Sequence, residues 1–492
     1  MSQLPADIYS VAGVREIDRS AIEDHGIPGY TLMARAGAAA VRAAQERFPD
    51  AQRWQVVCGA GNNGGDGYVV ARLAAHEGIV VSAIALVDPE SLGGDAAKAY
   101  ADFAAEGGIV MPWAGALDSE ADLLVDAILG SGLEREVTGE FARAVAAMNA
   151  QQAPVVSLDI PTGLHGDTGA VLGCAVRADL TVTFVGLKAG LFLGEASQYR
   201  GELRFAGLDI PGDVHTHVKP VFSRIDDAQL RRWLPRRPRA AHKGDFGHVL
   251  VVGGGQGMPG AVRLCGEAAL RGGAGLVSVA THPSHAALIA ASRPEIMPHA
   301  VNGPDDLAPL LERADVVAFG PGLGQDDWAR SLYEAVAADT RPCVWDADAL
   351  NLLGSMPSRH ENRVITPHPG EAARLLDGST AGIQADRPGA VAALVERYGG
   401  VAVLKGAGTL VRAGKGLPAI CTSGNPGMAV AGMGDVLTGL IAALLAQGLP
   451  LAAAAAVGVE AHARAGDRAA RAGERGMLAS DLLAELRAVL NP

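Results

Sequence analysis

Apolar segments of strand length alternate with alanine-rich helical segments along most of the chain. In the first half, strands are expected over Trp54–Cys58, Ile79–Leu86, Leu123–Ile128, Pro154–Asp159, Leu180–Val185 and Glu202–Ala206. In the second half, they are expected over Gly247–Val252, Leu276–Ala280, Val316–Phe319, Cys343–Asp346, Arg363–Ile365, Val401–Leu404 and Thr409–Arg412. Strands that alternate with helices are typical of βαβ units with parallel sheets. The pattern predicts an α/β fold throughout.

The alternation stops between Asp213 and Lys243, in a stretch that contains three prolines and a run of arginines. A chain of 492 residues is long enough for two or three domains. We therefore predict two α/β domains, residues 1–217 and 218–492, and interpret the arginine run as a solvent-exposed linker.

Composition excludes several classes of partner. The net charge of −13 disfavours binding to nucleic acid or to an anionic membrane. The five cysteines are scattered and form no CxxC pair, which argues against disulfides and a zinc ribbon. The start of the chain has no apolar signal segment, so a cytoplasmic location is expected.

One apolar stretch, Val436 to Val459, has no charged residue and could be taken for a membrane span. Gln447–Pro450 divides it into two pieces, each too short to cross a bilayer. We predict two buried helices joined by a turn.

A glycine-rich segment, Gly59–Gly67, follows an expected strand and precedes an expected helix, Tyr68–His76. Its sequence, GAGNNGGDG, contains GxGxxG, in which glycines let backbone amides approach a phosphate at a helix N-terminus. Asn62, Asn63 and Asp66 make this loop more polar than the loop of an ordinary dinucleotide-binding dehydrogenase. The loop therefore favours binding of sugar hydroxyls, phosphate or a monovalent cation, and a purely structural glycine turn is the alternative.

Two further segments accompany this loop: VDAILGSG at residues 125–132 and SLDIPTG at residues 157–163. In this order the three motifs resemble the N-terminal domain of the YjeF-type NAD(P)H-hydrate epimerases, over about Tyr9 to Asp213. The resemblance implies a Rossmann-like α/β/α sandwich, with Asp159 as a catalytic residue at the nicotinamide ring. It also implies hydrate binding by Asn62, Asn63, Gly64, Gly65, Asp66, Gly130, Ser131, Gly132, Leu133, Glu134, Arg135, Glu136 and Asp159.

The resemblance further implies that a potassium ion is held by Asn63, Asp126 and Thr162. Each of these residues follows an expected parallel strand, and such loops emerge at one edge of a sheet. The ligand set is all oxygen with one formal negative charge, which suits a hard monovalent cation and disfavours zinc or copper. The alternative is a structural role, in which Asp126 and Asp159 only cap the turns after their strands.

The second half carries a denser series of motifs. KGAGT at residues 405–409 ends a strand, and NPGMAVAGMGD at residues 425–435 leads into a long apolar helix with Asp435 in its first turn. A helix N-terminus can stabilise a phosphoryl group during transfer, and a carboxylate beside it can act as the base. Lys405 is not a Walker A lysine, because the sequence has no GxxxxGK[ST].

Together with TPHPGE at residues 366–371, these motifs resemble the ribokinase-like ADP/ATP-dependent NAD(P)H-hydrate dehydratases, over about Ala240 to Leu490. Met433 departs from the related motif, which commonly has threonine. The resemblance implies a ribokinase-like α/β/α domain with Asp435 as its catalytic residue. It implies hydrate binding by Ala261, Gly322, His368 and Asp435, and nucleotide binding by Lys405, Gly406, Ala407, Gly408, Thr409 and Gly434.

Both resemblances imply one function, the repair of hydrated NADH and NADPH. The first domain would interconvert the R and S hydrates, and the second would dehydrate the S-hydrate at the expense of ADP or ATP, with Mg²⁺. We expect small-molecule substrates and a homo-oligomer, without nucleic acid or membrane partners. The alternative is a ribokinase-like small-molecule kinase fused to a nucleotide-binding regulatory or interaction module.

Overall fold

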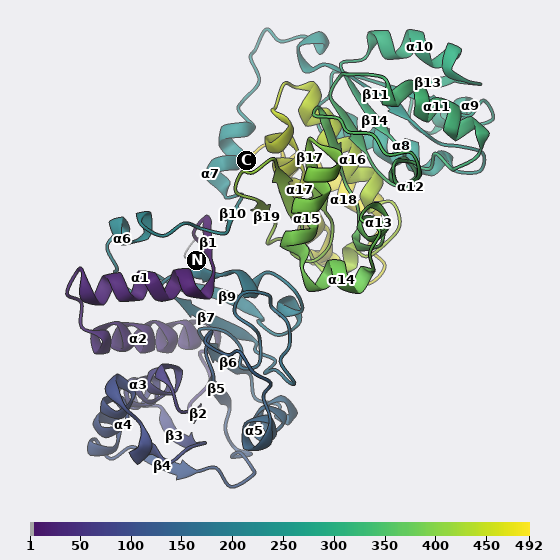
Figure 1. Ribbon diagram of the computed structural model, residues 1–492. Coiled ribbons are helices and arrows are strands. Elements are labelled where there is room, and N and C mark those ends of the chain that lie inside the picture. Colours follow the sequence, from purple (N-terminus) through teal and green to yellow (C-terminus); the bar gives the residue numbers. More distant parts are fainter. Residues whose placement is uncertain (1–3) are drawn as a thin grey trace. The chain divides into compact units, whose positions relative to one another are not determined.

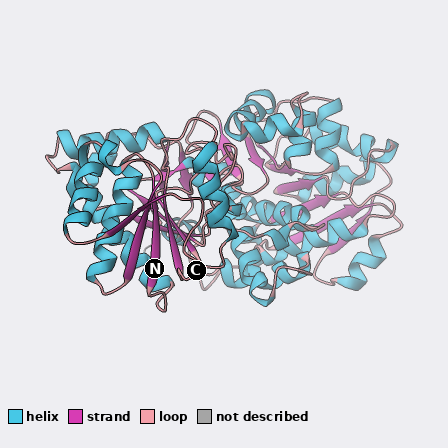
Figure 2. Cartoon of the chain, turned by 90° about the horizontal axis from the view of Figure 1, so that it is seen from below, coloured by secondary structure: helices cyan, strands magenta, loops and turns pink. Residues whose placement is uncertain are grey.

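The computed structural model describes residues 4–492, which form two compact units. The first unit ends at Phe222 and the second begins at Ser223. In each unit the strands lie between helices (Figures 1 and 2). Both units are thus α/β folds, as the sequence pattern predicts.

The first unit contains a seven-stranded parallel sheet in the order β4-β3-β2-β5-β6-β7-β9. Its strands are β2 Arg53–Cys58, β3 Val80–Ala85, β4 Ile109–Pro112, β5 Leu123–Ala127, β6 Val155–Leu158, β7 Leu180–Phe184 and β9 Glu202–Ala206. Strands β1 Asp7–Tyr9 and β8 Leu187–Lys188 also pair in parallel. Its helices are α1 Val11–Glu23, α2 Gly29–Arg47, α3 Asn62–His76, α4 Gly94–Ala105, α5 Gly139–Ala150 and α6 Gly212–Thr216. The central strands are buried along almost their whole length and consist mostly of apolar residues, as in a sheet covered on both faces.

The second unit contains a sheet in the order β13-β12-β11-β14-β15-β16-β17-β18-β19, with β10 beside β19. Neighbouring strands are parallel except around β18, which is antiparallel to β17 and β19. The strands are β10 Phe222–Arg224, β11 His248–Val252, β12 Leu276–Thr281, β13 Met297–Ala300, β14 Val316–Phe319, β15 Cys343–Trp345, β16 Arg363–Ile365, β17 Val401–Leu404, β18 Leu410–Ala413 and β19 Ala419–Ile420.

The helices of the second unit connect and cover these strands. They are α7 Asp227–Trp233, α8 Pro259–Arg271, α9 Ala286–Ser292, α10 Pro304–Arg313, α11 Asp327–Ala337, α12 Asp348–Ser355, α13 Pro369–Leu375, α14 Thr380–Ala385, α15 Arg387–Tyr398, α16 Met433–Ala446, α17 Leu451–Ala469 and α18 Ala479–Val489. Helices α16 and α17 are the two buried helices predicted over the uncharged stretch. Among the described residues, no helix is both long and apolar enough to cross a membrane.

The structure differs from the sequence prediction at the start of α3. The helix begins at Asn62 and not at Tyr68, so the polar part of the glycine-rich segment is helical. Because glycine has no side chain, the first turns of α3 can pack closely on the sheet. An added Cβ at Gly64 would lie 2.2 Å from the backbone oxygen of Gly59. One at Gly67 would lie 2.5 Å from the Ala127 side chain. Close packing of a helix, rather than a loose turn, accounts for these glycines.

Candidate active sites in the two units

A cavity of about 910 Å³ in the first unit is lined by segments that follow β2, β5 and β6. Open parallel sheets bind ligands at this edge. The predicted hydrate-binding residues all line the cavity, except Gly64, Gly65 and Glu136. Gly64 and Gly65 face neighbouring backbone and side chains, and Glu136 is exposed to solvent.

Asp159 lies in this cavity and is paired with a buried lysine. Its Oδ1 accepts a hydrogen bond from Nζ of Lys188, and its Oδ2 accepts one from the Ser131 N–H at 3.0 Å. Lys188 Nζ also donates to the Phe184 carbonyl at 2.8 Å and the Thr183 hydroxyl at 3.2 Å. Burial opposes ionisation of Asp159, but Lys188 overcomes this effect and holds the pKa of the carboxyl below its ordinary value.

Two other carboxyl groups line the same cavity, and their pKa values are shifted in the opposite direction. Burial raises the pKa of Asp66 well above its usual range, and the nearby charges of Asp159 and Asp18 raise it further. Burial also raises the pKa of Asp18 to about 6. One cavity therefore contains a pair of carboxyl groups, Asp159 and Asp66, whose pKa values are shifted in opposite directions. Such a pair can accept a proton from a ligand at one position and donate one at another.

Two of the predicted cation ligands, Asp126 and Thr162, are in direct contact, and the third, Asn63, lines the cavity. Asp126 is fully buried, and its carboxylate accepts hydrogen bonds from the Thr162 hydroxyl and N–H, the Ser157 hydroxyl and the Ile128 N–H. Burial raises the pKa of Asp126, and only these hydrogen bonds counteract it. Asn63 is also buried, and neither polar atom of its side chain has a partner among the described residues.

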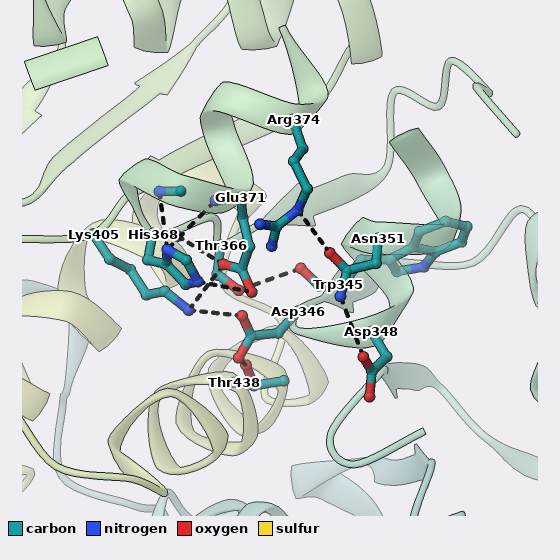
Figure 3. A network of polar contacts seen from close by, with 11 residues as sticks. Trp345, Asp346, Asp348, Asn351, Thr366, His368, Glu371, Arg374, Lys405 and Thr438 are labelled. Carbon is teal, nitrogen blue, oxygen red and sulfur yellow. Dashed lines mark hydrogen bonds and ion pairs between the residues drawn. The ribbon is translucent and has the colours of Figure 1, made fainter. Parts of the chain in front are cut away.

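In the second unit, a buried ion pair joins Asp346 to Lys405, which follows β17 (Figure 3). Lys405 Nζ lies 2.8 Å from Asp346 Oδ1 and 3.8 Å from Glu371 Oε2, and the Thr438 hydroxyl donates to Asp346 Oδ2 at 2.9 Å. Burial disfavours both charges, but their attraction and hydrogen bonds lower the pKa of Asp346 and raise that of Lys405. An added Cβ at Gly434 would lie 3.2 Å from Asp346 Oδ2 and 3.3 Å from Lys405 Nζ. The first turn of α16 thus touches the charged pair.

Asp435 stands in that first turn, as the sequence predicts. The turn opens at Gly432, whose φ of 90° is in the left-handed region that favours glycine. Burial raises the pKa of Asp435 to about 7, and the negative charges of Asp346 and Asp348 contribute. A carboxyl group with this pKa can act as a base at neutral pH.

Two other predicted hydrate-binding residues, Ala261 and Gly322, lie close to each other. An added Cβ at Gly322 would lie 3.0 Å from the Ala261 Cβ, so the two residues are neighbours. The N–H of Gly324 donates to Asp348 Oδ2 at 2.9 Å. The negative charge of Asp348, which holds this loop, also raises the pKa of Asp435.

His368 has a local structural role in the described structure. Its Nδ1 accepts hydrogen bonds from the Gly370 and Glu371 N–H groups at the start of α13, and Glu371 accepts from the His368 N–H at 2.8 Å. This reciprocal capping is the helix-start pattern expected for such spacing. The side chain is half-exposed, so the cap leaves part of the ring accessible to a ligand.

Comparisons with known proteins cover both units. A family model described as YjeF-related protein N-terminus matches residues 29–190, and one described as NAD(P)H-hydrate dehydratase matches residues 249–488. The bifunctional NAD(P)H-hydrate repair enzyme Nnr of Coxiella burnetii is 47% identical over 99% of both chains. The chain belongs to this family. The Escherichia coli member is 46% identical over 99% of this chain and 95% of its own.

As a member of this family, the chain is a bifunctional enzyme with an epimerase domain and a dehydratase domain. Among solved structures, a ribokinase-like superfamily protein from Enterococcus faecalis has a TM-score of 0.50 and 29% identity, covering 54% of this chain and 94% of its own. The ribokinase-like prediction for the second domain is confirmed.

Several residues of these sites were not among those predicted. Lys188 and Asp18 in the first unit and Asp346, Glu371 and Thr438 in the second unit complete the polar networks. A signal for Lys188 exists in the sequence, because it is the one charged residue in the apolar run TVTFVGLKAGLFL. Asp346 and Glu371 stand within recognised motifs, but sequence order does not reveal that Lys405 lies between their carboxylates.

Proposed function

We propose that the first domain, residues 1–217, interconverts the R and S hydrates of NADH and NADPH, and that the second, residues 218–492, dehydrates the S-hydrate. The observation that carries this proposal is the position of Asp435. Asp435 lies in the first turn of α16 and has a pKa of about 7, and the same turn contacts Lys405. A helix N-terminus and a lysine can stabilise a phosphoryl group during transfer, and a carboxylate can accept the proton of the attacking hydroxyl group.

In the second domain, Asp435 accepts the proton of the hydrate hydroxyl as its oxygen attacks the terminal phosphorus of the nucleotide. The N-terminus of α16 and Lys405 stabilise the negative charge that develops on the phosphoryl group. The phosphorylated hydrate then loses phosphate together with a proton from the neighbouring carbon, which restores the double bond. With ADP, the products are NAD(P)H, phosphate and AMP.

In the first domain, inversion at the hydrated carbon requires the hydroxyl to leave and water to return on the other face. Asp66, whose pKa is raised, can donate a proton to the departing oxygen, whereas Asp159, whose pKa is lowered, can accept one from the returning water. Lys188 acts as a positioning residue that keeps Asp159 ionised.

Potassium fits the first domain on the chemistry of its residues. Among the described residues, Asp126 has no cationic partner, and the amide oxygen of Asn63 has no donor. Asn63, Asp126 and Thr162 would hold the ion, which supplies a positive charge for a substrate phosphate. In the second domain, the described residues include no acidic cluster arranged to hold a metal ion. Mg²⁺ would therefore arrive with the nucleotide phosphates.

The test is incubation of the full chain with mixed hydrate epimers and either ADP or ATP. We expect recovery of reduced-nicotinamide absorbance and one inorganic phosphate for each molecule recovered. Conversion of both epimers would show epimerisation. Accumulation of a stable phosphorylated product would instead favour the small-molecule kinase. The cytoplasmic location and the homo-oligomeric state remain predictions from the sequence.

Replacing Asp126 by alanine tests the cation site. We expect weaker hydrate binding to the first domain and loss of any dependence on potassium, because the only charged ligand is removed. Dehydration of the S-hydrate should be unchanged. The measurements are hydrate affinity and melting temperature in potassium chloride and in choline chloride.

Asp122→Ala is the matched control, since Asp122 accepts only backbone hydrogen bonds at the start of the same strand. If Asp126→Ala lowers the melting temperature but keeps hydrate affinity, and the wild type shows no potassium dependence, Asp126 serves only as a cap.

A further inference from the structure

Arg387 is a buried cation that the proposed chemistry does not use. It begins α15 and is 4% exposed, and within the described chain it forms no ion pair with a carboxylate. Its guanidinium instead donates to three carbonyl oxygens, those of Leu404 (3.2 Å), Lys405 (3.4 Å) and Gly408 (3.2 Å), and to Gln384 Oε1 (2.9 Å). Burial lowers the pKa of Arg387 to about 10, so the group still carries its charge at neutral pH.

The three carbonyls belong to the KGAGT segment and the residue before it. In a trans peptide the carbonyl and the following N–H point in opposite directions, and the described chain has no cis peptide. The N–H groups of Gly406 and Thr409 therefore point away from Arg387. From Gly406 to Gly408, three successive N–H groups have no acceptor among the described residues. Consecutive free amides of this kind form a receptor for anions.

Gly406 shows how closely the loop packs on the guanidinium. An added Cβ at this position would lie 3.0 Å from Nη1 of Arg387, and the residue has a φ of 136°. Both features require glycine. The loop has no side chain at its closest point of approach, and its carbonyl oxygens contact the buried cation directly.

We propose that Arg387 is a positioning residue for the nucleotide. It draws the carbonyls of the 404–409 segment to one side, so that the opposite side presents free N–H groups to the phosphates. A bound nucleotide also supplies the negative charge that Arg387 lacks within the protein. This inference rests on the proposed nucleotide-binding role of Lys405 to Thr409.

The test compares Arg387→Gln and Arg387→Lys with the wild type in the full chain. The readouts are the Kd of ADP by calorimetric titration without hydrate, and the KM for ADP and kcat of dehydration. We expect Arg387→Gln to raise the Kd and KM about ten-fold, with kcat at saturating ADP within about two-fold. Arg387→Lys should be intermediate, because an ammonium keeps the charge but cannot reach three carbonyls at once.

Arg363→Lys is the matched control. Arg363 is 1% exposed on β16 and also donates to carbonyls, those of Ser358 and Tyr398, but it does not touch the loop. Its substitution should lower the melting temperature without changing the Kd of ADP. An unchanged Kd in Arg387→Gln, or an equal rise in Arg363→Lys, would overturn the inference. If the wild type binds ADP but recovers no NADH, the proposed function fails while the Kd comparison still decides the role of Arg387.

Discussion

Asp435→Asn should reduce nucleotide-dependent recovery of NADH by about 10²–10⁴-fold, while epimerisation continues at the wild-type rate. Asparagine has nearly the same shape as aspartate, so the first turn of α16 and its contacts with Lys405 are kept. It cannot accept the proton of the hydrate hydroxyl. The measurement is the initial rate of absorbance recovery with pure S-hydrate and saturating ADP, together with the rate of epimer exchange.

The same assignment predicts a pH profile. Because burial raises the pKa of Asp435 to about 7, the base is ionised above this pH and becomes protonated below it. Wild-type dehydration should therefore fall about ten-fold for each pH unit below about 6.5. Asp305→Asn, an exposed aspartate in the first turn of α10, is the control and should leave rate and profile unchanged. A near-normal rate in Asp435→Asn would refute the assignment.

Lys188→Met should destabilise the first unit by about 3–5 kcal/mol and abolish epimerisation. Methionine leaves the buried carboxylate of Asp159 without its cationic partner, so the pKa of Asp159 rises and the base is lost. Calorimetric unfolding of the full chain measures stability, and exchange between purified hydrates measures epimerisation. Lys98→Met, at an exposed lysine of the same unit, should change neither.

The double variant Lys188→Met, Asp159→Asn separates the effect on stability from the effect on epimerisation. It removes both charges, and asparagine tolerates the left-handed φ of 68° at position 159. Most of the lost stability should return, but epimerisation should not. Recovery of epimerisation in this double variant would show that Asp159 is not the base.

The architecture was predictable because strands and helices alternate along the sequence of an α/β fold. Runs such as Val316–Phe319 and Val401–Leu404 are apolar at every position, which is typical of a strand covered on both faces. Short strands at the sheet edges, such as β4 and β13, were not predicted, since their partly exposed positions do not form an apolar run. The start of α3 was placed too late, because glycine is a poor helix former and its packing partners are distant in the sequence.

The sites were predictable only where chemistry is concentrated in a motif. Asp435 lies in the motif NPGMAVAGMGD and Asp159 in the motif SLDIPTG, and both motifs are conspicuous in the sequence. Lys188 and Arg387 lie outside these motifs, and their importance arises from burial beside groups that are tens of residues away in the chain. Contacts of this kind depend on the tertiary fold, which local spacing does not encode.

The helical start of α3 affects the free energy of ligand binding. Asn62, Asn63 and Asp66 are held on a regular turn packed against strands, and not on a loop that must become ordered. The conformational entropy of the glycines in this turn is lost when the chain folds. A molecule that enters the cavity therefore meets a preorganised receptor, and its binding free energy is not reduced by ordering this backbone.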